Sequence, residues 1–557
     1  ALGNAVISGL GRKAAFCTTA YALVILPASL SMAASLASTG DEIRIDGVMD
    51  EAAWANATII GVDTETRPGE NTPAPVETTA YLIEDGRSLY IAFDARDPDP
   101  DAIRAYLRDR DNAFSDDSVG VVLDTYGDER YAFIFMVNAL GVQMDMTNDE
   151  INGNEDTSWD AIWDSAGKIT ANGYVVEMEI PLSQLRFPDT QEAKTWGVDA
   201  VRFYPRSNRH RFANNPLDRN RNCYLCQLGK MEALEGVEPA RDLEVTPTLT
   251  GIRTETTDDP GTVPLDDDGA DVEGGLTVRW GITPDLTANL AINPDFSQVE
   301  ADVAQLEVNN QFALFFPEKR PFFLEGADYF NTPVQAVFTR TVADPDVGAK
   351  LTGKKGNHTF GGYAARDALT NLLFPSAFGS DSTSLNEENT SIVGRYSYGF
   401  GEASSIGALV TVRDSDTYNN NVGGFDLRWR ITDQHTVSAQ YLHSETEYPD
   451  DIVTEFEQPD GSFTGEATFL SYVYESREWF GYLRHLDKSA DFRADLGFVP
   501  RVDASTQVVG LGRIWHGDED DSWHRIRVSG DWDITHDDQG RMIEREIEAN
   551  FNIGGPM

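Results

Sequence analysis

Two residues whose type and spacing could support chemistry stand close together in the segment RNCYLCQLG, namely Cys223 and Cys226. In an oxidising compartment such a pair is most simply a small disulfide loop. Thiol redox chemistry is a second interpretation. Zinc binding is a third, but a zinc site would need two further ligands, and the sequence has no second cysteine pair. We therefore expect a disulfide between Cys223 and Cys226.

Motifs that would identify an enzyme are missing from the sequence. It contains neither the HExxH pattern of zinc proteases nor the GxSxG pattern of serine hydrolases. The segment Gly348 to Lys355 (GAKLTGKK) comes near a phosphate-binding loop, but Lys355 stands where Ser or Thr would hold magnesium. A glycosidase needs two carboxylates across a cleft, and spacing cannot identify them among 92 acidic residues. No local motif therefore indicates a reaction.

Length and charge limit the class of protein. A chain of 557 residues exceeds one ordinary hydrophobic core, so we expect two domains after any targeting segment. The formal net charge is −48, with acidic residues spread along the whole chain. Because nucleic acid would be repelled by this charge, it is excluded as a partner.

The N-terminal residues 1–37 have the pattern of a signal peptide. Arg12 and Lys13 precede an apolar run from Ala14 to Leu30, and small residues follow, with Ala33 and Ala37 as candidate cleavage positions. A transmembrane helix is the alternative, but the run is short and contains a proline. No later segment approaches about 20 consecutive apolar residues, so a membrane-embedded part would be a β-barrel.

Residues 41–235 predict a β-sandwich. Short strand-like runs alternate with turn residues, as in TTAYLIEDGRSLYIAFDAR, where two apolar runs flank Asp85 and Gly86. In GYVVEMEIPLSQL, Val176, Met178 and Ile180 share one face of a strand. Short strands at this spacing are typical of a sandwich.

Residues 240–557 predict a transmembrane β-barrel. The strands become longer and the alternation stricter, as where Phe425, Leu427, Trp429 and Ile431 alternate with Asp426, Arg428 and Arg430. Apolar residues toward lipid and charged residues toward the lumen are the signature of an outer-membrane barrel. A soluble antiparallel sheet is the alternative. The ending FNIGGPM lacks a terminal aromatic strand, so we expect the barrel to be incomplete in this sequence.

The segment from Asn293 to Phe330 does not fit a lipid-facing strand. Val299, Val303 and Leu306 have helical spacing, and five phenylalanines then crowd around two prolines. Such a segment could fold into the lumen or cap the barrel on its periplasmic side. A packed plug is the simpler interpretation, and a binding surface is the alternative.

Several ordered motifs in the first domain resemble a known family. They are IRIDGVMDEAAW at Ile43 to Trp54, LYIAFDARDPDP at Leu89 to Pro100, DDSVGVVLDTYGD at Asp116 to Asp128 and SWDAIWDS at Ser158 to Ser165. Together they resemble the family 9 carbohydrate-binding module-like domain, a jelly-roll β-sandwich. The later motifs NPDFSQVEAD and FFPEKRPFFLEGADYF resemble the domain of unknown function DUF5916, an outer-membrane barrel domain that follows this module.

The resemblance to the carbohydrate-binding family implies sugar binding by aromatic rings. An indole ring matches the apolar face of a pyranose, while carboxylate and arginine side chains bind the rim hydroxyls. Trp159 and Trp163 are the candidates, with core or loop packing as the alternative. Trp54 is assigned to the core. The family also implies structural calcium, for which Asp109, Asp111, Asp116 and Asp117 form an oxygen-rich stretch, as do Asp97, Asp99 and Asp101. Solvated loop carboxylates are the alternative.

The function that these observations favour is non-enzymatic. We expect an outer-membrane protein whose periplasmic sandwich binds a carbohydrate or another envelope glycan and whose barrel serves as anchor or conduit. A carbohydrate-active O-glycosyl hydrolase in carbohydrate catabolism is one alternative. An envelope protein whose sandwich only docks a partner is the other, since likeness of fold does not establish likeness of ligand.

Overall fold

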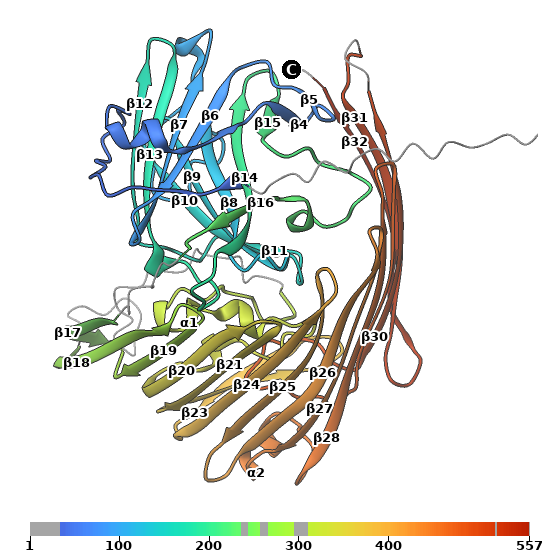
Figure 1. Ribbon diagram of the computed structural model, residues 1–557. Helices are drawn as coiled ribbons and strands as arrows, with labels where there is room; N and C mark the ends of the chain where they lie inside the picture. The colour runs from blue at the N-terminus through green and yellow to red at the C-terminus, as the bar shows by residue number, and fades with distance from the viewer. Residues whose placement is uncertain (1–33, 236–242, 257–265, 295–309, 518–520, 556–557) are drawn as a thin grey trace, which may run out of the picture. The chain divides into compact units, whose positions relative to one another are not determined.

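A computed structural model describes residues 34–235, 243–256, 266–294, 310–517 and 521–555 (Figure 1). The predicted signal peptide lies almost wholly outside the described residues, and so do Val299, Val303 and Leu306. In the described parts the chain is almost entirely β-structure, with two short α-helices and six short 3-10 helices. The prediction of an all-β chain is therefore confirmed. No described helix has the length and apolar character needed to cross a membrane.

Two β-sheets form the N-terminal sandwich. The first sheet contains β1 (Ala34–Ser35), β4 (Thr64–Arg67), β5 (Thr72–Pro73), β8 (Ser118–Asp124), β9 (Tyr131–Asn138), β10 (Gln143–Asp149), β11 (Asn154–Asp156), β14 (Lys194–Pro205), β15 (Arg209–Ala213) and β16 (Gly229–Ala233). The second contains β2 (Ala37–Ser38), β3 (Thr58–Gly61), β6 (Thr78–Glu84), β7 (Ser88–Arg96), β12 (Asp164–Thr170) and β13 (Gly173–Pro181). Short 3-10 helices connect them, namely η1 (Ala52–Asn56), η2 (Pro100–Ala102), η3 (Leu182–Gln184) and η4 (Leu225–Gln227).

The sandwich forms because the strands bury alternating apolar faces between the two sheets. Strands β6 and β7 pair as the predicted hairpin, and Gly86 takes the positive φ of +82° that its turn requires. Phe93 of β7 and Phe135 of β9 are fully buried in the shared core, together with Trp196 of β14. Burying a large aromatic side chain stabilises the fold by about 1.5–3 kcal/mol.

The second part of the chain forms one antiparallel sheet of fourteen strands, which we call the long sheet. Its strands are β17 (Leu243–Thr256), β18 (Asp266–Thr283), β19 (Leu286–Ile292), β20 (Pro345–Lys355), β21 (His358–Asp367), β24 (Asn389–Phe400), β25 (Ser404–Asp414), β26 (Asn419–Thr432), β27 (His435–Glu447), β28 (Phe463–Glu475), β29 (Trp479–Lys488), β30 (Ala504–His516), β31 (Arg525–His536) and β32 (Met542–Gly554). Each strand pairs with the next, and β17 and β32 are the two edges. In the part of the chain that the structure describes, these edges do not pair, so the sheet is not closed.

The two ends of the long sheet differ in their connections. At one end, two or three residues join β18 to β19, β20 to β21, β24 to β25, β26 to β27 and β28 to β29. The connection from β30 to β31 at this end, residues 517–524, is the longer exception. We call this the short-turn end. At the other end the connections are longer and carry a hairpin of β22 (Thr370–Pro375) and β23 (Ser380–Leu385), as well as α2 (Asp450–Glu455). The two ends of the long sheet thus differ in the length of most of their connections.

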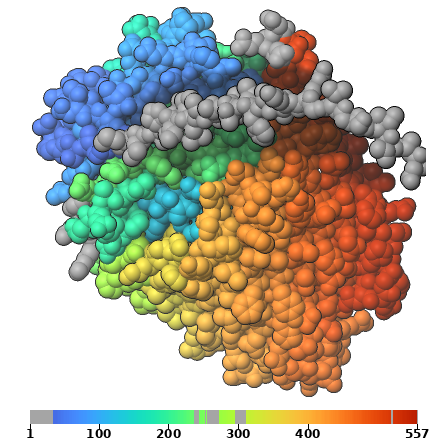
Figure 2. Space-filling view, turned by 45° about the vertical axis from the view of Figure 1, so that its right-hand side comes forward, coloured from blue at the N-terminus to red at the C-terminus, as the bar shows by residue number. Residues whose placement is uncertain are grey.

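The long sheet has one polar, filled face and one apolar, exposed face. On β26, Phe425 is 67% exposed and Trp429 47% exposed, whereas Arg430 between the outward positions is buried. Exposed large apolar side chains recur on the neighbouring strands, for example Ile406, Leu470 and Leu483. The outer side of these strands forms the orange-to-red surface in Figure 2.

Residues 310–344, the described part of the chain before β20, lie on the inner face of the long sheet. They include α1 (Pro321–Leu324), η5 (Ala327–Phe330) and η6 (Thr339–Thr341). The ring of Phe322 lies against Gly348 and that of Phe330 against Gly361, where an added Cβ atom would lie 3.0 and 3.1 Å from the ring, so that the ring would have to shift slightly. These residues are therefore packed against the inner face of the sheet, as a plug would be. We call residues 310–344 the plug segment.

Candidate ligand site between the sandwich and the long sheet

The sandwich contacts the short-turn end of the long sheet through successive turns. Lys354 at the first turn lies 2.6 Å from the carboxylate of Asp128. At the next turn Arg130 donates to the carbonyl of Gly401 over 3.3 Å. The backbone N–H of Asn222 donates to the carbonyl of Asp433 over 2.7 Å. These contacts fix the sandwich against the end of the sheet where the strands are most tightly connected.

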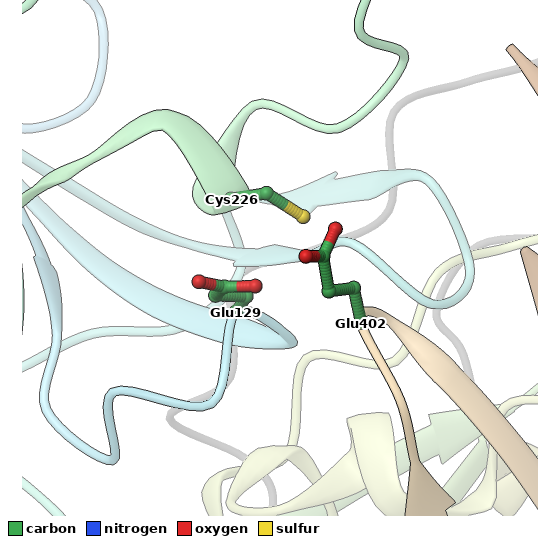
Figure 3. Close-up of side chains that lie close together, drawn as sticks. All are labelled: Glu129, Cys226 and Glu402. Carbon is green, nitrogen blue, oxygen red and sulfur yellow. The ribbon is translucent and has the colours of Figure 1, made fainter. Parts of the chain in front are cut away.

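The disulfide lies at the centre of this junction. Cys223 and Cys226 are bonded, with Cα atoms 5.5 Å apart. Figure 3 shows Cys226 beside Glu129 and Glu402, with one ligand-type atom of each within 4.8 Å of the others. These groups are already engaged, because the sulfur is in the disulfide and Glu402 lies 3.0 Å from Arg221. They do not form a free metal site.

A partly open cavity of about 130 Å³ lies between the sandwich, the plug segment and the inner face of the long sheet. That volume suits one ring-sized group, since an engineered protein cavity of about 150 Å³ holds benzene. The lining combines aromatic rings with charged groups, among them Tyr126, Tyr131, Phe133, Asp149, Arg186, Asp328, Tyr329, Arg395, Asp426 and Arg428. We call this the interface cavity.

Two charges on the same sheet face differ in how they are paired. Arg395 binds Asp426 in a bidentate pair, with contacts of 2.5 and 2.8 Å. Arg428 has no ion pair within 4.0 Å among the described residues, and its Nε atom is buried without a hydrogen-bond partner. Arg428 is half-buried, and because burying part of a cation without a partner is costly, it is a group that a bound ligand could satisfy.

The plug segment supplies a carboxyl group, that of Asp328, whose pKa is raised well above its ordinary value. Burial raises the pKa of Asp328 to about 7, with Asp149 and Asp156 adding to the rise and Arg186 opposing it. Near neutral pH this carboxyl can therefore both donate and accept a proton. No side-chain hydrogen bond to Asp328 occurs within the described ranges, so its carboxyl is available to a ligand.

The neighbouring Glu325 is a structural anchor. Burial opposes ionisation of its carboxyl, but Arg186 and Arg279 outweigh burial and hold its pKa at about 2. Its oxygen lies 2.9 Å from Arg279 on β18 and 3.4 Å from Arg186 of the sandwich. Arg186 also donates to the hydroxyl of Tyr329 over 3.0 Å. Glu325 thus ties the plug segment to both parts of the molecule.

The two predicted sugar-binding tryptophans lie in the sandwich at different depths. Trp163 is 5% exposed, and its ring packs edge-on against Phe135 at 5.3 Å. Trp159 is half-buried and lies 5.1 Å from Phe133, which lines the interface cavity. The position of Trp163 favours the packing alternative. A ligand role for Trp159 stays a prediction, and Trp54 is buried as expected.

The four aspartates proposed for calcium do not lie together. Asp116 and Asp117 are buried and accept hydrogen bonds from the backbone of Tyr106 and Arg104, whereas Asp109 is exposed on its loop. Asp111 instead lies with two acids that sequence spacing could not link to it, Asp145 and Asp160, whose carboxylate oxygens are within 4.8 Å. All three surround one guanidinium, described next.

Arg110 occupies the position that a cation would take in this acidic group. Its Nε lies 3.1 Å from Asp160, and its guanidinium also contacts Asp145 and Asp111. The second predicted stretch is engaged as well, since Asp97 binds Arg206 over 2.5 Å. The residues present therefore fit a calcium ion only if Arg110 withdraws, and calcium binding stays a prediction.

Comparisons with known proteins agree with this division of the chain. Residues 45–211 match the family model "Carbohydrate family 9 binding domain-like", and residues 242–358 match "Domain of unknown function (DUF5916)". The expected order of the two domains is confirmed. None of the curated proteins matches the sequence.

Three solved structures share low similarity with the chain. A candidate carbohydrate-binding protein from Bacteroides uniformis has 15% identity and a TM-score of 0.30, covering 36% of this chain and 98% of that one. OccAB4 of Acinetobacter baumannii has 10% identity and a TM-score of 0.25, covering 78% and 85%. OccK7 of Pseudomonas aeruginosa has 8% identity and a TM-score of 0.24, covering 89% and 96%. TM-scores this low do not establish a common fold.

Proposed function

We propose that this protein is an outer-membrane protein that binds a carbohydrate without turning it over. The observation that carries the carbohydrate part is the interface cavity, because it joins aromatic rings and an unpaired arginine at a domain that matches the family 9 carbohydrate-binding model. Rings that stack on a pyranose and charged groups that bind hydroxyls are the two parts of a sugar site.

The membrane part of the proposal rests on the exposed face of the long sheet. Monomeric soluble proteins rarely expose contiguous apolar patches beyond a few hundred Å². Here Phe425, Trp429 and Ile431 on β26 continue sideways into exposed apolar residues of the adjacent strands. A lipid bilayer is the partner that fits such a face, and barrel strands present this alternation to it.

The turns of the long sheet support a side of the membrane for the sandwich. Outer-membrane barrels have short turns on the periplasmic side and long loops outside. The sandwich contacts the short turns, as in the Lys354–Asp128 and Asn222–Asp433 contacts. This supports a periplasmic sandwich.

Calorimetry on the detergent-solubilised full chain with a panel of neutral oligosaccharides tests the proposal. In Arg428→Gln the affinity is expected to fall about tenfold or more while the melting temperature stays close to that of the wild type, because no ion pair or side-chain hydrogen bond holds this arginine in the part of the chain that the structure describes. The matched control is Arg366→Gln, which removes an exposed arginine paired with Glu388 outside the cavity and should leave both the affinity and the melting temperature close to those of the wild type. Absence of saccharide binding, or unchanged binding by Arg428→Gln, overturns the proposal.

A second candidate function is glycoside hydrolysis, which the Asp328 carboxyl favours. An acid with a pKa of about 7 matches a general acid, and Asp149 lies in the same cavity. If the wild type releases reducing sugar and Asp328→Asn does not, the protein is a glycoside hydrolase, and the proposal of binding without turnover is wrong.

A further inference from the structure

A second hollow, of about 620 Å³, lies at the same junction but away from the interface cavity. It is bordered by the ends of β4 and β15, the loop around residues 217–227, the turn after β28, the end of β30 at Ile514 and His516, and the start of β31 at His524 and Arg525. Six of its 19 lining residues are arginines, against two carboxylates. The whole chain has 44 lysines and arginines against 92 acidic residues, so this concentration of positive charge is local. We call it the arginine pocket.

Three of the six arginines have structural partners. Arg219 and Arg477 both bind the carboxylate of Glu70, at 2.8 Å and at 2.5 to 3.0 Å respectively. Arg221 lies 3.0 Å from Glu402 of the long sheet. These three hold the sandwich to the sheet and need no ligand.

The other three are Arg67, Arg209 and Arg525, and they lack a carboxylate partner. No ion pair within 4.0 Å reaches any of them in the described part of the chain, and all three remain open to water in the pocket. Arg209 donates only to the carbonyl of Phe114, over 2.7 Å, and lies over the ring of Phe203. They come from β4, β15 and β31, so only the docking of sandwich and sheet brings them together.

The like charges of the pocket are only partly relieved, since Glu475 opposes the effect of Arg525 and its neighbours from the pocket wall. Burial lowers the pKa of Arg67, and the nearby cations Arg211 and Arg525 lower it further. Burial and Arg67 likewise lower the pKa of Arg209, while burial and Arg525 lower that of His524. A bound anion would relieve this repulsion.

Guanidinium groups suit one class of ligand especially well. Their planar N–H donors match the oxygens of carboxylate, sulfate and phosphate in bidentate pairs. The net charge of −48 does not cancel a local site, because at physiological salt charges beyond about 8 Å are largely screened. The pocket can therefore select an anion that the protein as a whole does not attract.

We propose that the arginine pocket binds the acidic groups of an anionic oligosaccharide, through Arg67, Arg209 and Arg525. This inference rests on the proposed carbohydrate function and adds the class of sugar. The neutral part of the ligand would lie in the open part of the pocket itself, which has a volume of about 620 Å³.

Calorimetry on the detergent-solubilised full chain tests the inference with three probes: trigalacturonate, its methyl ester and inorganic sulfate. The wild type is expected to bind trigalacturonate at least tenfold more tightly than the uncharged ester, with an affinity that falls as salt rises. The double variant Arg67→Gln/Arg209→Gln is expected to lose this preference, and Arg67→Lys/Arg209→Lys to keep part of it. Arg44→Gln, which removes an exposed arginine outside the pocket, serves as the control.

Each of the other outcomes overturns either the arginine pocket as the anion site or the proposed function as a whole. Equal affinity for acid and ester, with binding retained, overturns the arginine pocket and leaves the proposed function standing. A preference for the acid that survives in Arg67→Gln/Arg209→Gln places the anion elsewhere and also overturns it. Sulfate binding as tight as that of trigalacturonate reduces the pocket to a site for free inorganic anions. If no saccharide of either kind binds, the proposed function fails as well.

Discussion

The guanidinium of Arg430 on β26 lies 2.9 Å from the sulfur of Cys226. This contact joins two residues that are 204 positions apart in the sequence. The disulfide of the sandwich is thus one of the groups that hold the sandwich to the long sheet. Ile151 and Ala403 pack around the same sulfurs from the two sides of the junction.

The double variant Cys223→Ser/Cys226→Ser is expected to lower the melting temperature. The lost loop constraint is small, about 1–2 kcal/mol for so short a loop, and the loosened contact with Arg430 adds to it. Thermal denaturation with and without a reductant measures the effect. Reductant should shift the wild type toward the variant and leave the variant unchanged. A variant that still responds to reductant contradicts this assignment.

Asp328→Asn is expected to change the pH dependence of stability. The pKa of Asp328 is about 7 in the folded protein, above its ordinary value of 3.8. A carboxyl with a raised pKa favours the folded state at low pH, and this contribution is lost as pH rises from about 4 through 7. The advantage of Asp328→Asn over the wild type should therefore grow over this range and then level off.

Melting temperatures of both proteins from pH 4 to pH 9 provide the measurement. The gain at pH 8 is expected to be of the order of a few kcal/mol, since each pKa unit corresponds to about 1.4 kcal/mol. Asp41→Asn, at an exposed position, is the matched control. Parallel curves for wild type and Asp328→Asn would show that Asp328 is not buried as described.

Local patterns in the sequence predict local structure well in this chain. The alternation of Phe425, Trp429 and Ile431 with Asp426 and Arg430 predicts an extended strand with one apolar and one polar face, and β26 has both. The turn at Gly86 is likewise confirmed. In each case the signal lies within one or two strands, where the period of two residues applies.

The cavities could not be predicted, because their residues meet only through docking. Tyr131, Asp328 and Arg428 come from the sandwich, the plug segment and β26, and no spacing relates them. The same holds for Arg67 and Arg525. Among many acidic residues, spacing also failed to link Asp111 with Asp145 and Asp160, since strand pairing and a loop bring them together.

Arg110→Gln is expected to make the acidic group of Asp111, Asp145 and Asp160 responsive to calcium. With the guanidinium removed, three carboxylates lose their common cation, so calcium can take its place. The melting temperature of this variant should rise more with calcium, relative to EDTA, than that of the wild type. Magnesium, which prefers stricter geometry, serves as the control. An equal rise in both proteins would contradict a site at Arg110.

Trp163→Ala is expected to lower mainly the stability of the protein, whereas Trp159→Ala is expected to lower mainly its affinity for a saccharide. Trp163 is buried in the sandwich core, so its truncation should destabilise the protein by about 3–5 kcal/mol. Trp159 is half-buried beside the cavity, so its truncation should cost less stability and lower saccharide affinity. Denaturation and calorimetry of the full chain separate the two. A stable Trp163→Ala protein that has lost saccharide binding would instead make Trp163 a ligand residue.

Phe425→Arg is expected to hinder insertion of the long sheet into a bilayer. This side chain points outward and is 67% exposed, so in a membrane it would contact lipid. An arginine at such a position costs about 2–4 kcal/mol near the bilayer midplane. The matched control is Glu445→Arg, an outward and exposed position on β27 among charged residues, where the change should cost little. The folded fraction in lipid vesicles over a urea series measures both variants. If Phe425→Arg folds into vesicles as well as Glu445→Arg, the apolar face does not contact lipid there, and a protein partner becomes the better explanation for it.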